Sequence, residues 1–261
     1  MKIYDCFLYY NENLVLDIRL NTLSKYIDKF IIVESMFDHQ GNEKKLNFRI
    51  ENFQSFKDKI IYLIVERFPD NMSNWERENY QRDFIVNGLK NAEDEDFIII
   101  SDIDEIPDLS NISSIKEYKF SVFEQKMFYY KINLQNKTSP FWYGSRICKK
   151  KYLKSPQWLR DQKVKDYPFW RFDKIKWNII KSGGWHFSYV MSDKNIINKI
   201  KSFAHAEYND RKFLNIKKIK KNISDRKDLF NRPYKFDKIK NLKKLPNYII
   251  KNKKKFKLFM V

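Results

Sequence analysis

The stretch that decides the fold spans residues 97–105 and reads FIIISDIDE. Four apolar residues are followed by two carboxylates, Asp102 and Asp104, spaced i and i+2. A short, fully apolar run of this kind is typical of a strand in the middle of a parallel sheet. If the strand continues, the spacing puts both carboxylates on one face. Asp and Glu are poor strand formers, so we expect the pair to serve a function.

Two carboxylates at the end of a buried strand suit a divalent cation. Mg²⁺ and Mn²⁺ prefer oxygen ligands, and such ions bridge one or two carboxylates to substrate phosphates. We therefore predict a site for Mn²⁺ or Mg²⁺ at Asp102 and Asp104. The alternative is a solvated acidic turn that precedes a helix beginning near Pro107.

Working outward, the same pattern repeats toward the N-terminus. Periodicity predicts strands at residues 3–10, 30–35 and 59–66, and helices at 14–26 and 75–90. Strands alternating with helices indicate an α/β fold with a parallel sheet, and ligands bind such sheets at the carboxyl ends of the strands. The polar residues at those ends are the binding candidates: Asn11, Glu12, Glu34, Glu66, Asp102, Asp104 and Glu105.

The second predicted helix adds a basic candidate. We take Asn74 as its N-cap, and Arg82 lies on it shortly before the acidic stretch. Arginine there could bind a diphosphate with two parallel hydrogen bonds. The alternative is a surface ion pair with Glu78, four residues earlier on the helix.

After about residue 119 the sequence changes character. Residues 120–133 predict a long aromatic strand, and scattered tryptophans indicate mixed β structure with long loops, where an acceptor could stack. Two of the five glycines stand together before Trp185 and His186. Paired glycines allow a ligand to approach the backbone closely. His186 is therefore a candidate ligand for a metal or a phosphate, the alternative being an ordinary core or surface histidine.

Composition excludes several classes. Aromatic residues make up 17% of the 261 residues, which argues against disorder. Two cysteines, Cys6 and Cys148, exclude a disulfide scaffold and a CxxC zinc site. No apolar run reaches 18 residues and no signal-peptide core is present, so we expect a protein that is cytoplasmic or peripheral at a membrane. The Rossmann, P-loop and hydrolase-elbow motifs are absent from the sequence.

Basic charge is concentrated at the C-terminus. Residues 211–261 hold 19 Lys and Arg against three Asp, so they carry sixteen of the net charge of +19. We predict a globular domain over 1–210 and a basic, helical C-terminal extension over 211–261. Lysines beside Tyr248, Ile249 and Phe256 suit an anionic membrane surface. The alternatives are a solvated tail and non-specific nucleic-acid binding. No specific nucleic acid is expected.

Several blocks together are similar to a known family. In order along residues 3–207, the chain resembles glycosyltransferase family 17, the group of the β-1,4-mannosyl-glycoprotein N-acetylglucosaminyltransferases. The resemblance implies a single GT-A domain, an inverting mechanism, a nucleotide-sugar donor such as UDP-GlcNAc, a divalent cation and a glycan acceptor. The blocks that carry it are Asn11-Glu12, residues 16–20, residues 33–35, Gly41 to Phe48, Phe68-Pro69, Tyr80 to Arg82, residues 101–107 and residues 184–188.

The resemblance also implies roles for single residues. It makes Asp102, Asp104 and His186 the metal ligands, with Asp104 the more direct of the two carboxylates. The implied donor-binding residues are Asn11, Glu12, Glu34, Arg82, Asp102, Gly184 and Trp185, with Glu34 toward the nucleoside and Arg82 toward the diphosphate. Inversion needs a general base near the acceptor hydroxyl, and Glu124 and Glu207 are the candidates.

Two other classes of function compete with this one. A nucleic-acid-binding protein would use the basic tail and the aromatic residues. Its affinity would survive the loss of Asp102 and Asp104 and would vanish without residues 211–261. A non-catalytic glycan-binding module could share the same fold, but the presence of both aspartates and His186 argues against it.

Overall fold

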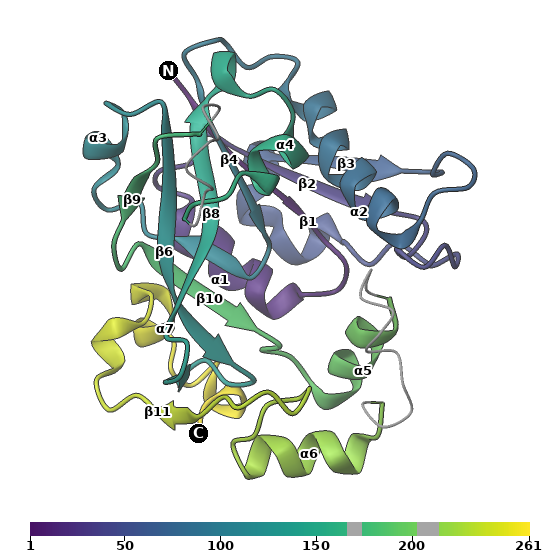
Figure 1. Ribbon diagram of the computed structural model, residues 1–261, viewed down its shortest axis with the longest axis vertical. Helices are drawn as coiled ribbons and strands as arrows, with labels where there is room; N and C mark the ends of the chain where they lie inside the picture. The colour runs from purple at the N-terminus through teal and green to yellow at the C-terminus, as the bar shows by residue number, and fades with distance from the viewer. Residues whose placement is uncertain (166–173, 203–213) are drawn as a thin grey trace.

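The computed structural model describes residues 1–165, 174–202 and 214–261 (Figure 1). Within these residues, 11 strands form one sheet, with helices on both of its faces. The main path of the sheet runs β11-β7-β6-β8-β4-β1-β2-β3. The predicted α/β class is confirmed.

The parallel half of the sheet holds the four strands predicted from apolar runs. Cys6 of β1 pairs with Ile31 of β2 on one side and with Ile100 of β4 on the other. All three residues are fully buried, as expected for strands covered on both faces. Leu8 pairs with Asp102, so β1 and β4 end at the same edge. The bounds are β1 Ile3–Leu8, β2 Lys29–Ser35, β3 Ile60–Val65 and β4 Phe97–Asp102.

The second half of the sheet is mixed, as predicted. The long strand β8 is antiparallel to both β4 and β6, and the short strand β10 is antiparallel to β5 and parallel to β6. His186 of β10 therefore lies opposite Glu105 of β5, and Glu105 directly follows the acidic turn, which comprises residues 102–104. The bounds are β5 Glu105–Pro107, β6 Phe120–Tyr129, β7 Leu134–Asn136, β8 Phe141–Lys149, β9 Asn178–Ile180, β10 Gly184–Ser188 and β11 Phe236–Lys238.

The helices bury apolar faces against the two sides of the sheet. Leu16 and Leu20 of α1 join Phe7 in one core, and Ile85 joins Cys6 in the other. The α-helices are α1 Asn13–Leu23, α2 Asn74–Asp83, α3 Ile112–Ile115, α4 Pro156–Asp161, α5 Asp193–Ser202, α6 Ile216–Ser224 and α7 Asn247–Lys251. The 3₁₀ helices are η1 Ile50–Lys59, η2 Phe84–Leu89, η3 Lys150–Tyr152, η5 Leu242–Lys244 and η6 Lys257–Phe259. Of the helices in the described ranges, none is both long and apolar enough to cross a bilayer.

The helix predicted for residues 75–90 differs from the prediction at both ends. Its N-cap is Ser73 and not Asn74, because the Ser73 hydroxyl accepts the Glu76 N–H while the Glu76 carboxylate accepts the Ser73 N–H. This reciprocal pair is a capping box. At the other end, α2 stops at Asp83 and the chain continues as the tighter helix η2.

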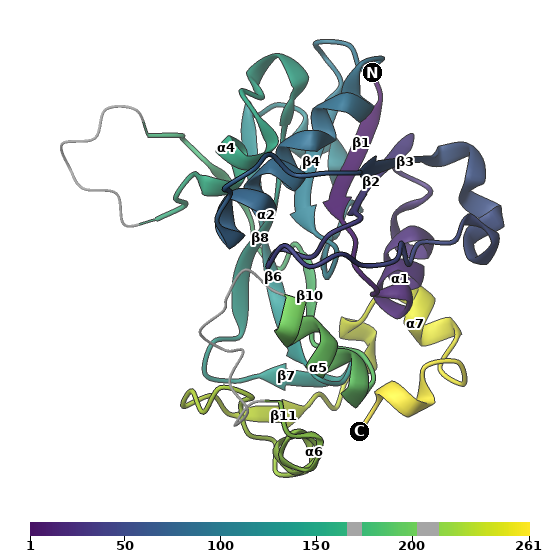
Figure 2. The same cartoon turned by 90° about the vertical axis from the view of Figure 1, so that its right-hand side faces the viewer.

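The C-terminal segment belongs to the same core as the rest of the chain. The charge distribution predicts a basic extension over residues 211–261, but β11 pairs with β7, and Ile249 and Phe256 are fully buried in the core that contains α1. Helix α7 lies beside α1 in both views (Figures 1 and 2). Apolar residues spaced along a basic segment can face a lipid surface or a protein core, and here these two face the core.

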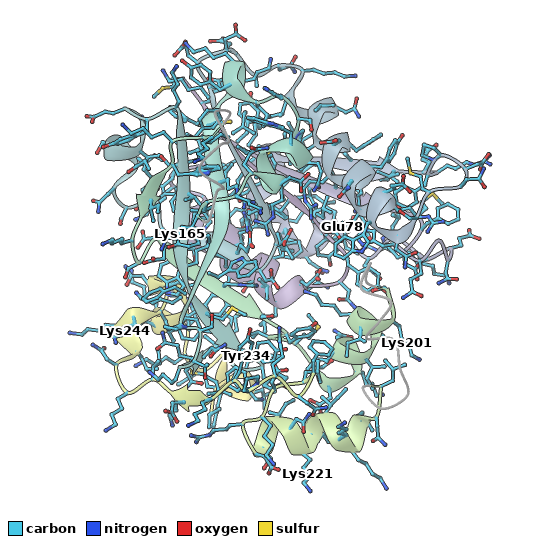
Figure 3. All side chains as sticks on the ribbon, in the orientation of Figure 1. Glu78, Lys165, Lys201, Lys221, Tyr234 and Lys244 are labelled. Carbon is cyan, nitrogen blue, oxygen red and sulfur yellow. The ribbon has the colours of Figure 1, made fainter. Side chains whose placement is uncertain are left out.

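Most lysines that the structure describes in this segment are exposed. Lys221 and Lys244 are exposed and project from separate parts of the surface (Figure 3). Of the large apolar residues near the C-terminus, Leu258 is 82% exposed. Exposed lysines are therefore still available to an anionic membrane surface. Ile249 and Phe256, which were expected to insert into the membrane, are buried in the protein.

Candidate active site

A cavity of about 280 Å³ opens at the edge where the parallel strands end. Residues that follow β1, β2 and β4 line it, together with side chains from α2, β10 and α5. This is the position at which α/β sheets bind ligands. The predicted site residues among its lining are Glu12, Arg82, Asp102, Asp104 and His186.

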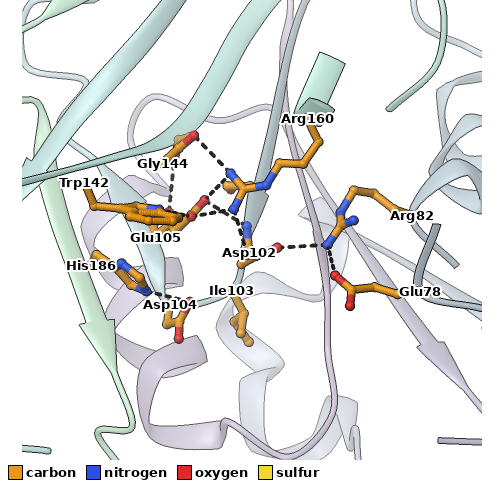
Figure 4. Close-up of polar contacts among 12 residues, drawn as sticks. Glu78, Arg82, Asp102, Ile103, Asp104, Glu105, Trp142, Gly144, Arg160 and His186 are labelled. Atoms are coloured by element: carbon orange, nitrogen blue, oxygen red, sulfur yellow. Dashed lines mark hydrogen bonds and ion pairs between the residues drawn. The ribbon is translucent and has the colours of Figure 1, made fainter. Parts of the chain in front are cut away.

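The two aspartates of the acidic stretch face different partners. Strand β4 ends at Asp102 and a turn follows, so the i, i+2 spacing does not place both carboxylates on one strand face. Asp102 lies between two arginines: its Oδ1 is 3.2 Å from Arg82 Nη2 and its Oδ2 is 2.8 Å from Arg160 Nη2 (Figure 4). The surrounding protein would raise the pKa of Asp102, but Arg160 and Arg82 lower it below its ordinary value.

Asp104 points to the other side of the turn, toward His186 and Lys199. Its Oδ1 lies 3.6 Å from His186 Nε2, and its Oδ2 lies 3.4 Å from Lys199 Nζ. Burial would raise the pKa of Asp104, but these two neighbours lower it well below its usual range. Burial would likewise lower the pKa of His186, while the carboxylate of Asp104 raises it overall. The histidine Nδ1 is buried and has no hydrogen-bond partner among the described residues.

Lys199 forms ion pairs with both the turn after β1 and the acidic turn. Its ammonium group lies 3.2 Å from Glu12 Oε1 as well as close to Asp104. The other oxygen of Glu12 accepts the N–H groups of Tyr10 and Asn11, each at 3.0 Å, and so fixes the turn after β1. The ammonium group of Lys199, from α5, thus lies between two carboxylates of the cavity lining.

Arg19 holds the acidic turn from behind. It is completely buried and forms an ion pair with Asp5 of β1, with Nη2 to Oδ1 at 2.5 Å. Its Nη1 donates to the carbonyl oxygens of Asp102, Ile103 and Glu105 at 2.8–3.1 Å. Three carbonyls of residues 102–105 thus bind one planar guanidinium, and the fourth, that of Asp104, accepts the Phe187 N–H at 2.8 Å, so the backbone that positions the Asp104 side chain is fixed.

Glu105 is the buried neighbour of the site. Its carboxylate binds both Nη atoms of Arg160, at 2.8 and 2.6 Å, and accepts the indole N–H of Trp142 at 2.6 Å (Figure 4). Arg160 comes from α4, which begins at a Ser155 N-cap followed by Pro156. Sequence reasoning missed Arg160 because only the serine and proline signal the helix, and nothing links it to Asp102, 58 residues earlier.

The cavity carries a net negative charge. Among the described residues that line it, five carboxylates face three permanent cations, which leaves two negative charges when both histidines are neutral: Glu12, Asp38, Glu78, Asp102 and Asp104 against Lys44, Arg82 and Lys199. A diphosphate entering such a cavity would be repelled unless further positive charge came with it.

A family model described as "Glycosyltransferase family 17" matches residues 1–261. The chain belongs to glycosyltransferase family 17. The resemblance inferred from the acidic and histidine blocks is thereby confirmed, and with it the class of enzyme, a glycosyltransferase.

Curated relatives match part of the chain. The Beta-1,4-mannosyl-glycoprotein 4-beta-N-acetylglucosaminyltransferases of Homo sapiens and Rattus norvegicus are each 32% identical over 114 residues, which are 40% of this chain and 21% of the relative. The match thus spans about a fifth of the length of these relatives. Among solved structures, a glycosyltransferase involved in the glycosylation of the major capsid of PBCV-1 aligns with 69% of this chain and 82% of its own, at 10% identity and a TM-score of 0.33.

Within this family 17 chain, Glu34 does not line the cavity but lies behind Lys44, which does. Its buried carboxylate binds Lys44 Nζ at 2.7 Å, the N–H groups of Asn47 and Phe48 at 2.7 and 3.0 Å, and the Tyr62 hydroxyl at 2.8 Å. These four donors tie the loop after β2 to the sheet. The predicted contact with a nucleoside is therefore not supported by the geometry, because the carboxylate already has its partners within the protein.

We expect Glu34→Ala to destabilise the fold by at least about 2 kcal/mol, since it leaves buried donors without an acceptor. Chemical denaturation measures this loss. Affinity for UDP at low temperature should change little, because Glu34 does not line the cavity. A stable variant that no longer binds UDP would restore the nucleoside role.

Four further predicted residues have other positions. Glu124 pairs with Tyr143 while its neighbour Gln125 pairs with Trp142, so strand alternation puts Glu124 on the sheet face opposite Trp142 and His186. Trp185 is buried, and its indole donates to the Lys244 carbonyl. Asn11 and Gly184 do not line the cavity. Glu207 lies outside the described residues.

Gly184 has a structural reason for being glycine. Its φ is +136°, a conformation that other residues rarely adopt, and a Cβ there would overlap the carbonyl oxygen of Ile106. The close pairing of β10 with β5 depends on it. Gly184 therefore contributes to the site indirectly, by placing His186 opposite Glu105.

The predicted metal ligands are only partly brought together. Asp104 and His186 are adjacent, whereas both oxygens of Asp102 are turned toward arginines. In the described ranges, no cluster of three His, Cys, Asp or Glu side chains is arranged to hold a metal ion. A carboxylate beside an imidazole whose Nδ1 has no hydrogen bond to any described residue nevertheless suits Mn²⁺ or Mg²⁺ when substrate phosphates complete the ligand set.

Proposed function

We propose that this chain transfers a sugar, with inversion, from a nucleoside diphosphate to a hydroxyl group of a glycan, and that the donor is UDP-GlcNAc. The observation that carries the proposal is the cavity at the carboxyl ends of β1 and β4, where Asp104 and His186 meet in a family 17 chain. The curated relatives carry N-acetylglucosaminyltransferase names, which supports the choice of donor sugar.

The side chains divide the work of holding the donor. Asp104 and His186 would hold Mn²⁺ or Mg²⁺ between them and the donor phosphates. The bound ion acts as a Lewis acid toward the leaving diphosphate. Its two positive charges would also offset the two negative charges of the cavity lining.

Arg82 lies on the opposite side of Asp102. It is held by Glu78 at 2.7 Å and by Asp102 at 3.2 Å, and it also binds the side chain of Gln157. The predicted ion pair with Glu78 therefore exists, but it is largely buried and part of the cavity lining. A guanidinium in this position can donate to the oxygens of the diphosphate and stabilise the charge that develops on it.

The acceptor hydroxyl must lose a proton as the glycosidic bond forms. Glu124 faces the other side of the sheet, so we retain Glu207 as the proposed general base. It follows α5, whose residues Lys199 and Ser202 line the cavity.

A donor screen tests the proposal. The full chain is incubated with UDP-GlcNAc, UDP-glucose, UDP-galactose and GDP-mannose, with Mn²⁺ and with EDTA, and the released nucleotide is measured. We expect release of UDP from UDP-GlcNAc that requires Mn²⁺. If no donor releases nucleotide, the proposed transferase activity is contradicted. If release with EDTA equals release with Mn²⁺, the proposed metal dependence is contradicted.

His186→Ala should weaken the binding of UDP in the presence of Mn²⁺ by about tenfold, or 1.4 kcal/mol. The reason is that the variant keeps Asp104 but loses the imidazole beside it. Calorimetric titration measures the affinity, and the same titration in EDTA is the control, in which the two proteins should agree. Equal affinity in Mn²⁺, or a variant that unfolds, would give His186 a structural role only.

A further inference from the structure

Trp142 is exposed and yet fixed in place. The residue is 45% exposed on β8, and its indole N–H donates to Glu105 Oε1 at 2.6 Å. Glu105 is fully buried, and its carboxylate is held in turn by both Nη atoms of Arg160. An exposed tryptophan usually needs no partner for its ring edge, because water satisfies the N–H. Here a buried ion pair holds the edge of the ring instead (Figure 4).

The layer beneath the indole is tightly packed. Gly144 follows Trp142 by two residues, and a Cβ at Gly144 would overlap the side-chain oxygen of Gln125 and press on the carboxylate of Glu105. Arg160 Nη1 also donates to the Gly144 carbonyl at 3.0 Å. The orientation of the indole is therefore set before any ligand arrives, which lowers the entropic cost of binding on its exposed surface.

The indole lies next to the reacting groups but outside the cavity lining. Its ring centroid is 5.7 Å from that of His186, and His186 Nε2 is 3.6 Å from Asp104. Figure 4 shows Trp142 and His186 on one side of the acidic turn and Arg82 with Glu78 on the other. A donor whose diphosphate lies at Asp104 and Arg82 would therefore leave the indole of Trp142 free, next to the His186 end of the site.

We propose that Trp142 is the acceptor subsite, on which one pyranose ring of the acceptor glycan stacks. A pyranose has an apolar face of C–H groups and a rim of hydroxyls. The negative face of an aromatic ring attracts such C–H groups. The inference rests on the proposed transferase function and adds where, and by which surface, the acceptor is held.

The experiment compares three full-length proteins: wild type, Trp142→Ala and Phe141→Ala. Phe141 is the matched control, because it is 44% exposed on the same strand and alternation places it on the opposite face. Binding to an array of defined oligosaccharides is measured with UDP and Mn²⁺ present. UDP affinity is measured separately by calorimetry.

We expect Trp142→Ala to lose glycan binding by about tenfold or more while UDP affinity stays within about twofold. Phe141→Ala should match the wild type in both measurements. If Trp142→Ala fails to fold, Trp142→Phe supplies the test: it keeps a ring but loses the N–H, and it should retain more glycan binding than Trp142→Leu.

Three outcomes would overturn the proposal. These are equal glycan binding by wild type and Trp142→Ala, a wild-type protein that binds UDP but no glycan, and a Trp142→Ala variant that loses UDP as strongly as glycan. The last result would assign the ring to the nucleotide. A wild-type protein that does not bind UDP at all would contradict the proposed function. In that case the array would still show whether glycan binding depends on Trp142.

Discussion

Asp104→Asn should reduce donor turnover by about a thousandfold, equivalent to about 4 kcal/mol of barrier, at saturating Mn²⁺. The substitution keeps the size of the side chain and removes the charge that faces His186 and Lys199. Release of UDP from UDP-GlcNAc measures the effect. The fold should survive, because the turn is held by its backbone carbonyls on Arg19 and not by this side chain.

Asp108→Asn is the matched control for this variant. Asp108 lies four residues further along the same segment, does not line the cavity, and accepts the N–H of Ser110. The Asp108→Asn variant should turn over donor at the same rate as the wild type. An Asp104→Asn protein that turns over donor at a near-normal rate would remove Asp104 from the centre of the proposed mechanism.

The largest expected effect on stability comes from Phe256→Ala, which should cost about 3 to 5 kcal/mol. The ring is fully buried in the core shared with α1, and its removal leaves a cavity there. Urea denaturation followed by fluorescence measures the loss. Leu258→Ala, two residues away and 82% exposed, should change stability by less than about 0.5 kcal/mol.

Equal stability of these two variants would show that the C-terminal segment is a dispensable appendage, as the charge distribution alone had indicated. The expected difference also limits how membrane binding can be tested. Removing the segment would expose the core that Phe256 fills, so a truncated chain would report unfolding as well as lost charge.

The parallel half of the fold could be predicted because its signals are local. Each of the strands β1 to β4 is a short apolar run; β1, β2 and β4 are buried on both faces, so they show no alternation, and the edge strand β3 is half-buried. The carboxyl-end rule then placed Glu12, Asp102 and Asp104 at one edge without any knowledge of long-range contacts.

The rest of the site depends on contacts between distant residues. Arg160 and Lys199 reach the acidic turn from helices 55 to 95 residues further along the chain, and no spacing rule connects them to it. Arg19 was visible only as one residue in a family block, since nothing in the sequence says that a helical arginine will be buried against three carbonyls.

Two expected side-chain orientations differ from the structure for physical reasons that the sequence does not contain. Whether Glu124 faces the cavity depends on the register of β6 against β8, and that register shifts between Val122 and Glu124. Whether Ile249 and Phe256 face lipid or protein depends on whether another part of the chain, here α1, offers an apolar surface for them to pack against. Composition describes both alternatives equally well.

The carboxylate of Glu105 has a consequence for anyone who wishes to redirect this enzyme to a new substrate. One buried group orients both Arg160, which reaches Asp102, and Trp142, which we assign to the acceptor. Changing Glu105 would therefore disturb recognition of both substrates at once, and a library built there would be dominated by inactive members. Positions around the exposed face of the indole can be varied without touching that shared anchor, which makes them the better starting point for engineering.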